Sequence, residues 1–198
     1  MSLTEIQVDE NFAAFGLPAP PPAEMFALEA IPDTFVAEQT IIDLPQVQSE
    51  VLPVAQMFYL ATDHGATSAT LSSMVQSSLT ESQLAAALVS SQAFANVNNG
   101  GVLLDPNAPV SESLVEVLFI RDLGHAPSEA TLAGFEGMSN AQAFLAFSTS
   151  ETVTNALAPT INTYLIQVQE LASGVPMGDP IASSVQIVGQ AGTAHLAG

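Results

Sequence analysis

Apolar residues recur at three- and four-residue spacing over two stretches of the chain, 51–97 and 112–157. This spacing is typical of short helices with one buried face. The two stretches also resemble each other, because residues 57–76 align without a gap on residues 118–137, placing Phe58 on Phe119 and His64 on His125. A repeat of this kind predicts one supersecondary unit present in two copies.

Capping residues mark where the predicted helices begin. Thr80 with Gln83 and Ser139 with Gln142 both have capping-box spacing, and they correspond to each other in the two copies after a two-residue deletion. In such a box the hydroxyl accepts from the N3 amide and the Gln side chain bonds back to the N-cap amide. We therefore expect equivalent helices to start at these two positions.

A second pair of signals lies earlier in each copy. Gly124 stands where a helix C-cap glycine belongs, and Ser128 is a candidate N-cap for the next helix. Thr67 corresponds to Ser128 in the first copy, whereas Asp63 stands in place of the glycine. Each unit is thus predicted to consist of about three short helices.

The first 50 residues differ from the rest, with prolines at 18, 20, 21, 22, 32 and 45. Proline at this density favours extended backbone, so the segment is predicted to be an extended Pro-rich arm. It also carries large apolar side chains that a solvated linker would lack. The arm is therefore expected to dock, either on its own helical domain or on a neighbouring subunit.

The C-terminal region is predicted to contain a further helix and a strand. The helix spans Ile161 to Ala172, and the alternating segment 184–188 indicates a strand-like tail. The fold class is mostly α, with two tandem short-helix repeats. The expected divisions are the arm (1–50), repeat 1 with its connecting turn (51–110), repeat 2 plus the additional helix (111–178) and a β-like tail that is a possible secretion signal (179–198).

Charge narrows the range of functions. The 198 residues include 20 carboxylates and one cation, Arg121, for a net charge of −19. Nucleic acids and anionic membrane surfaces are disfavoured because both are bound through Lys and Arg. No run of about 18 apolar residues is present, so the chain is not expected to span a membrane. No basic residue precedes Arg121, so we expect the chain to be either cytoplasmic or exported without a cleaved N-terminal signal.

Candidate chemistry is sparse. His64 and His125 each lie beside an acid, which allows a metal or acid/base pair, but the simpler interpretation is that each imidazole bonds a loop at its helix end. Asp105 and Asn107 carry oxygens of the kind that calcium binds, although these residue types usually form turns. No catalytic motif is present, so we expect no enzyme activity, no catalytic or metal-binding residue and no cofactor, with calcium as the one candidate ion.

The repeat resembles a helical domain of unknown function found in large bacterial surface proteins, including surface-layer proteins and adhesins exported by type I secretion. Three segments carry the resemblance: residues 119–123, the loop Gly124–Pro127 and residues 144–151. The first copy departs from the pattern at Asp63 and at Ala66-Thr67. The resemblance implies an acidic, cysteine-free protein at the surface of a Gram-negative bacterium, and the calcium-binding glycine repeats common in that secretion class are absent.

We therefore expect an extracellular structural subunit that self-assembles into a cell-surface filament, layer or matrix. The partner is a further copy of the chain. The alternative is a monomeric module that anchors to surface polysaccharide, and a weaker third hypothesis is an enzyme that uses the His64 and His125 region. The expected assembly contacts are Phe12, Phe15, Phe26, Phe35, Ile41, Ile42, Val185 and Ile187.

Overall fold

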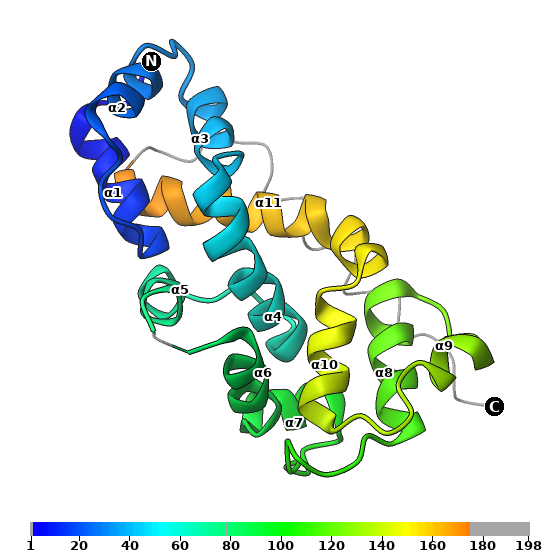
Figure 1. Ribbon diagram of the computed structural model, residues 1–198. Coiled ribbons are helices and arrows are strands. Elements are labelled where there is room, and N and C mark those ends of the chain that lie inside the picture. Colours follow the sequence, from blue (N-terminus) through cyan, green and yellow to red (C-terminus); the bar gives the residue numbers. More distant parts are fainter. Residues whose placement is uncertain (1, 78, 175–198) are drawn as a thin grey trace, which may run out of the picture.

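The computed structural model describes residues 2–77 and 79–174. This part of the chain is mostly α, as predicted, and contains no strand, only an isolated antiparallel bridge between Pro109 and Ser139 (Figure 1). The helices are α1 (Glu5–Phe15), α2 (Pro22–Glu29), α3 (Thr34–Ile42), α4 (Leu52–Thr62), α5 (Ser68–Val75), α6 (Glu81–Val89), α7 (Gln92–Asn98), α8 (Glu112–Leu123), α9 (Glu129–Ala133), α10 (Asn140–Ser148) and α11 (Glu151–Ser173), with a π-helical turn, η1 (Val47–Val51), before α4.

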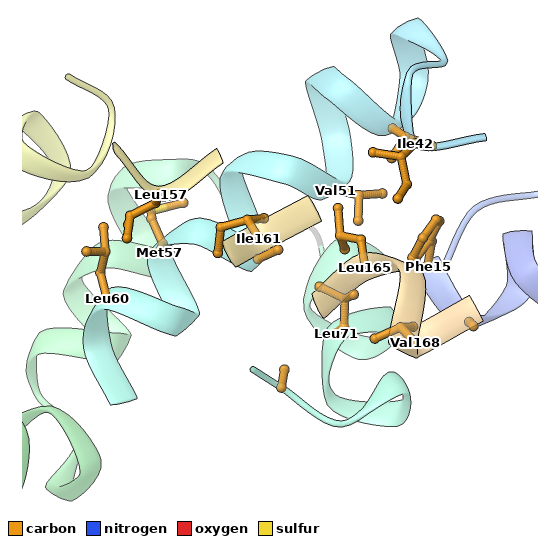
Figure 2. Close-up of a cluster of buried hydrophobic side chains, with 14 of the residues drawn as sticks. Phe15, Ile42, Val51, Met57, Leu60, Leu71, Leu157, Ile161, Leu165 and Val168 are labelled. Carbon is orange, nitrogen blue, oxygen red and sulfur yellow. The ribbon is translucent and has the colours of Figure 1, made fainter. Parts of the chain in front are cut away.

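Helix α11 connects the two ends of the molecule. It packs on α1 and α3 near its C-terminus and on α4, α8 and α10 nearer its start (Figure 1). Figure 2 shows Leu157 and Ile161 beside residues of α4, and Leu165 near Phe15 of α1. One face is buried along the whole helix because its apolar residues recur every three or four positions, at Val153, Leu157, Ile161, Leu165 and Val168.

The start of α11 differs from the prediction of a helix beginning at Ile161. The helix begins at Glu151, is capped by Ser150, and runs through Pro159. An interior proline removes one backbone hydrogen bond and usually ends a helix. Here buried residues on both sides, Leu157 and Ile161, hold the two halves on the same core, so tertiary packing overrides the proline.

The prediction of an extended arm over residues 1–50 is wrong. This segment folds into the N-terminal unit, α1–α3, because its prolines lie between or at the start of helices and not inside them. Pro22 is the first residue of α2, a position where the missing amide is not needed. The unit packs on α11 and α5 of its own chain, as the first of the two docking alternatives expected.

The two stretches that align in sequence have the same helix caps. Both predicted capping boxes are present, at Thr80 and Ser139, and Thr67 and Ser128 cap α5 and α9 as predicted. At the C-cap of α4, Asp63 adopts the left-handed backbone (φ 59°) that Gly124 adopts after α8 (φ 75°). Asp tolerates this conformation better than most residues, which explains why it stands in the glycine position.

Helices that correspond in the two copies also pack in corresponding ways. Helix α6 packs on its counterpart α10. Helix α4 packs on both α7 and α11, and its counterpart α8 packs on the same two helices. At the centre of this arrangement, Phe94 and Phe144 meet edge to face with ring centroids 5.2 Å apart. The two units are therefore paired with each other inside one chain.

The loop between α4 and α5 lies against the middle of α11. A Cβ at Gly65 would lie 2.3 Å from the ring of Tyr164, whose hydroxyl donates to the Ala66 carbonyl at 2.8 Å. Burial raises the pKa of Tyr164 to about 12, so this hydroxyl stays a donor at any physiological pH. The glycine is thus required by close approach of the loop to an aromatic ring.

We predict that Gly65→Ala destabilises the protein by roughly 1–3 kcal/mol, because the added methyl forces the ring to move. Urea unfolding followed by circular dichroism measures the change. As a control, Gly65→Ala in a Tyr164→Leu background removes the clash and should add no further loss. An equal loss in both backgrounds would show that the ring contact is not the cause.

Candidate functional site

Four of the residues expected to make assembly contacts lie in the core of their own chain. Phe12 and Phe15 of α1 face α11, and Ile41 and Ile42 of α3 join the same buried cluster. None of the four is free to contact another molecule while the unit stays docked. Val185 and Ile187, with the rest of the predicted tail at 179–198, lie outside the described residues.

The other two, Phe26 and Phe35, are exposed. Phe26 on α2 has 69% of its surface accessible, and Phe35 on α3 has 49%. Ile6 (70%) and Val36 (50%) are exposed on the same unit. We call these four residues the exposed N-terminal residues. They are carried by α1–α3, which lie together at one end of the molecule (Figure 1).

The local sequence explains why these side chains point outward. In α2 the core takes Met25 and Leu28, so Phe26, on the opposite side, is left in solvent. In α3 the Asp33 side chain accepts from the Val36 amide and starts the helix, which places Phe35 in an outward first turn. The exposure of Ile6 was not predicted from the sequence. The signal that could have shown it is the helical spacing of Val8, Phe12 and Phe15, which puts Ile6 on the other side of α1.

The N-terminal unit is strongly acidic. Between residues 5 and 43 it carries eight carboxylates and no Lys, Arg or His. Apolar side chains here are therefore surrounded by negative charge only. Contact with another acidic surface would need either screening by salt or cations to offset the repulsion.

The chain's one Lys or Arg residue, Arg121, bonds to groups on three helices. Arg121 of α8 forms a two-pronged pair with the neighbouring Asp122, at 2.7 and 2.6 Å. Its other donors reach Asn98 of α7 and the Leu60 carbonyl in the last turn of α4. A cation at a helix C-terminus also interacts favourably with the helix dipole. Arg121 thus joins α4, α7 and α8 through a single side chain.

Asp122 is held in this cluster with only 5% of its side-chain surface exposed. Burial raises the pKa of Asp122 above its usual range, and the hydrogen bonds and charge of Arg121 oppose that rise. The arrangement satisfies buried groups where helices meet, so we assign it a structural role.

The two histidines have matching environments. The Nδ1 atoms of His64 and His125 each lie within hydrogen-bond distance of the next residue's carbonyl, at 3.2 and 3.0 Å. Each ring also lies near a phenylalanine, Phe58 or Phe119, with centroids 5.9 and 6.4 Å apart. This confirms the interpretation that each imidazole bonds the loop at its helix end.

The candidate calcium oxygens form a turn. Asp105 Oδ1 accepts from the Asn107 amide at 2.9 Å, which is the hydrogen bond of an Asx turn. Within residues 2–77 and 79–174, no three His, Cys, Asp or Glu side chains gather as a metal site would require. In the same ranges, no helix has the length and apolar content needed to cross a bilayer.

Some of the surface hollows in the described part of the chain are large enough to consider as sites. One, of about 240 Å³, lies between α8 and α9 and is lined by Val115, Leu132 and Phe135 and by three glutamates. The second, of about 390 Å³, lies beside Tyr164 and Leu171 and has mostly apolar walls. The third, of about 350 Å³, lies between α3, α4 and α11, and its walls are also mostly apolar. Amide and hydroxyl groups from Gln48, Gln56, Thr154 and Asn162 lie among the apolar residues.

Comparisons with family models, with curated proteins and with solved structures find no match to this chain.

We predict that Arg121→Met lowers the free energy of unfolding by about 3 kcal/mol, because it leaves the buried Asp122 carboxylate without its cation and the Leu60 carbonyl without its donor. Chemical denaturation measures the loss. The double variant Arg121→Met with Asp122→Asn removes the unpaired charge and should recover part of the stability. A single variant as stable as the native protein would contradict the role given to this side chain.

Proposed function

We propose that this protein is a non-enzymatic extracellular structural subunit whose copies assemble into a filament, layer or matrix at the surface of a Gram-negative bacterium. The observation that carries the proposal is the group of exposed N-terminal residues, Ile6, Phe26, Phe35 and Val36. Large apolar side chains gathered on one unit are typical of surfaces that contact other proteins.

The arrangement of the repeats supports the same location for the contact between copies. Since α6 packs on α10 within the chain, the faces that join the two units are already in use. A contact between chains must then use other surfaces, and the N-terminal unit lies at the end of α11 away from the repeats' paired helices (Figure 1). Head-to-tail contact through such an end produces filaments or sheets when it does not close on itself.

Composition sets the conditions for this assembly. Each copy carries a net charge of −19, so neighbouring copies repel one another at low ionic strength. Added salt or a divalent cation screens this repulsion, while apolar contact strengthens in salt. Surface export by type I secretion follows from the resemblance of the repeat and remains part of the proposal.

The alternative function is a monomeric module that anchors to surface polysaccharide. The hollow between α3, α4 and α11 is the observation for it, since Gln56, Thr154 and Asn162 place a few amide and hydroxyl groups in its mostly apolar wall. Several of these groups are already bonded within the chain: Asn162 and Gln39 bond each other in both directions, and Gln48 donates to the Ile42 carbonyl. A glycan-array screen with binding that Asn162→Ala abolishes would favour this alternative.

We predict that Phe26→Ser with Phe35→Ser prevents assembly and leaves the monomer folded, because both side chains lie outside the core. Negative-stain microscopy and sedimentation velocity measure assembly, and thermal unfolding measures the fold.

The matched control is Val102→Ser with Leu103→Ser, which removes two apolar side chains of similar exposure from the loop after α7. The control should assemble like the native protein. Deletion of residues 1–50 is a poor test because it removes Phe12 and Phe15 from the core. Assemblies that persist in the Phe26 and Phe35 variant would exclude this surface as the contact.

A further inference from the structure

A carboxyl group is buried where the N-terminal unit meets α11. Glu38 of α3 is 1% exposed, and its Oε1 atom has no hydrogen-bond partner within residues 2–77 and 79–174. Gln169 of α11 is fully buried and donates from Nε2 to the Glu38 carbonyl at 3.2 Å, but its Oε1 atom also has no partner. Asn11 of α1 is fully buried as well, with neither side-chain atom bonded. Buried polar groups are normally paired, so this layer is unusual.

No cation on the packed helices is available to pair with Glu38. The charges that act on its carboxyl are both negative, those of Glu170 of α11 and Asp33 at the start of α3. Arg121 is held by Asp122, Asn98 and the Leu60 carbonyl, where α4, α7 and α8 meet. Every charged side chain on α1, α2, η1 and α11, the elements around α3, is likewise a carboxylate: Glu5, Asp9, Glu10, Glu24, Glu29, Glu50, Glu151 and Glu170.

The protonated form is the one that suits this environment. A neutral carboxyl needs no counter-ion, and its O–H group is a hydrogen-bond donor. The Gln169 oxygen is an acceptor that has no donor. An ionised carboxyl has no donor and would face only like charge. Burial, followed by the charges of Glu170 and Asp33, raises the pKa of Glu38 from 4.5 to about 7.

We propose that Glu38 is a proton-operated latch: its neutral carboxyl holds α3 on α11, and its ionisation loosens α3 from that helix. The latch rests on the burial of Glu38 between two helices, on its unpaired oxygen and on the absence of a cation in the surrounding elements. Its effect is local opening of α3, a nine-residue helix.

The size of the effect decides how far the latch opens. Helix α1 remains anchored by Phe12 and Phe15, two large side chains that are fully buried in the core. A single ionisation is too weak to release that surface. It is large enough to change the population of an α3 that opens by itself, since local openings need less free energy than global unfolding.

The direction of the pH dependence follows from linkage. The folded-state pKa of Glu38 lies above 4.5, so docking of α3 is fully favoured below pH 4.5 and weakens as pH rises through about 7. If the opened helix has the ordinary pKa of 4.5, its population rises about 30-fold between pH 5.5 and pH 8.

Opening of α3 would expose Ile41 and Ile42, two of the residues expected to contact other copies. This consequence rests on the proposed function: exposure of these residues makes assembly easier at mildly alkaline pH than at acidic pH. The latch itself is independent of that function, because the opening of α3 can be measured on the monomer.

The experiment is amide hydrogen exchange of the monomeric full-length protein at pH 5.5 and pH 8, with rates corrected for intrinsic exchange. In the native protein we expect protection of the α3 amides to fall about 30-fold between the two pH values. In Glu38→Gln the fall should disappear. Glu170→Gln should show a smaller fall than the native protein because it removes the first of the two like charges.

Glu10→Gln is the matched control, since it removes one exposed carboxylate from the same unit and should behave like the native protein. An equal fall in Glu38→Gln and in the native protein would overturn the latch. Should Glu38→Gln fail to fold, a carbon-13 NMR titration of the native Glu38 carboxyl decides the matter. A midpoint near 7 supports the latch and a midpoint near 4.5 overturns it.

Discussion

The packing of α11 is the interaction on which the rest of the structure depends. This 23-residue helix contacts both the N-terminal unit and helices α4, α8 and α10. Five side chains along one face, from Val153 to Val168, are buried. At roughly 1.5–3 kcal/mol for each buried side chain, this face contributes on the order of 10 kcal/mol before chain entropy is counted, about as much as the net stability of a whole domain.

A shortage of cations is the second constraint. With one Lys or Arg residue in 198, the fold cannot be held by ion pairs, and helix caps and apolar packing take that role. Ser, Thr or Asp side chains cap nine of the described α-helices by accepting from the first turn. The single arginine lies where its guanidinium group forms hydrogen bonds with groups on three helices. Elsewhere the buried Glu38 has an Oε1 atom without a hydrogen-bond partner among the described residues, and protonation removes the cost of burying its charge.

Local signals in the sequence were reliable, and signals that depend on distant contacts were not. The caps at Thr80, Ser139 and Ser128 were predictable because each depends on residues within one helical turn. The prediction for the proline-rich segment was wrong because proline disfavours helix interiors but is well tolerated at helix starts, as at Pro22. The sequence alone did not show that these prolines lie at helix starts or between helices.

The same limit applies to the candidate site. Phe26 and Phe35 were found as apolar residues in a segment that had to dock, yet the sequence did not separate them from Phe12 and Phe15, which are buried. Helical phase within α1 and α2 makes that distinction once the helices are known. The burial of Glu38 could not be predicted, because it arises from α11, whose contacting residue is 131 positions away.

The central claim is that copies of this chain assemble. The most direct test is sedimentation velocity with negative-stain microscopy of the unmodified protein over a concentration series, at about 20 mM and about 500 mM salt, where screening lengths differ several-fold. We expect monomers at low salt and low concentration, and regular filaments or sheets that grow with both variables. Separate monomers under every condition would contradict it and would favour the polysaccharide-anchoring module.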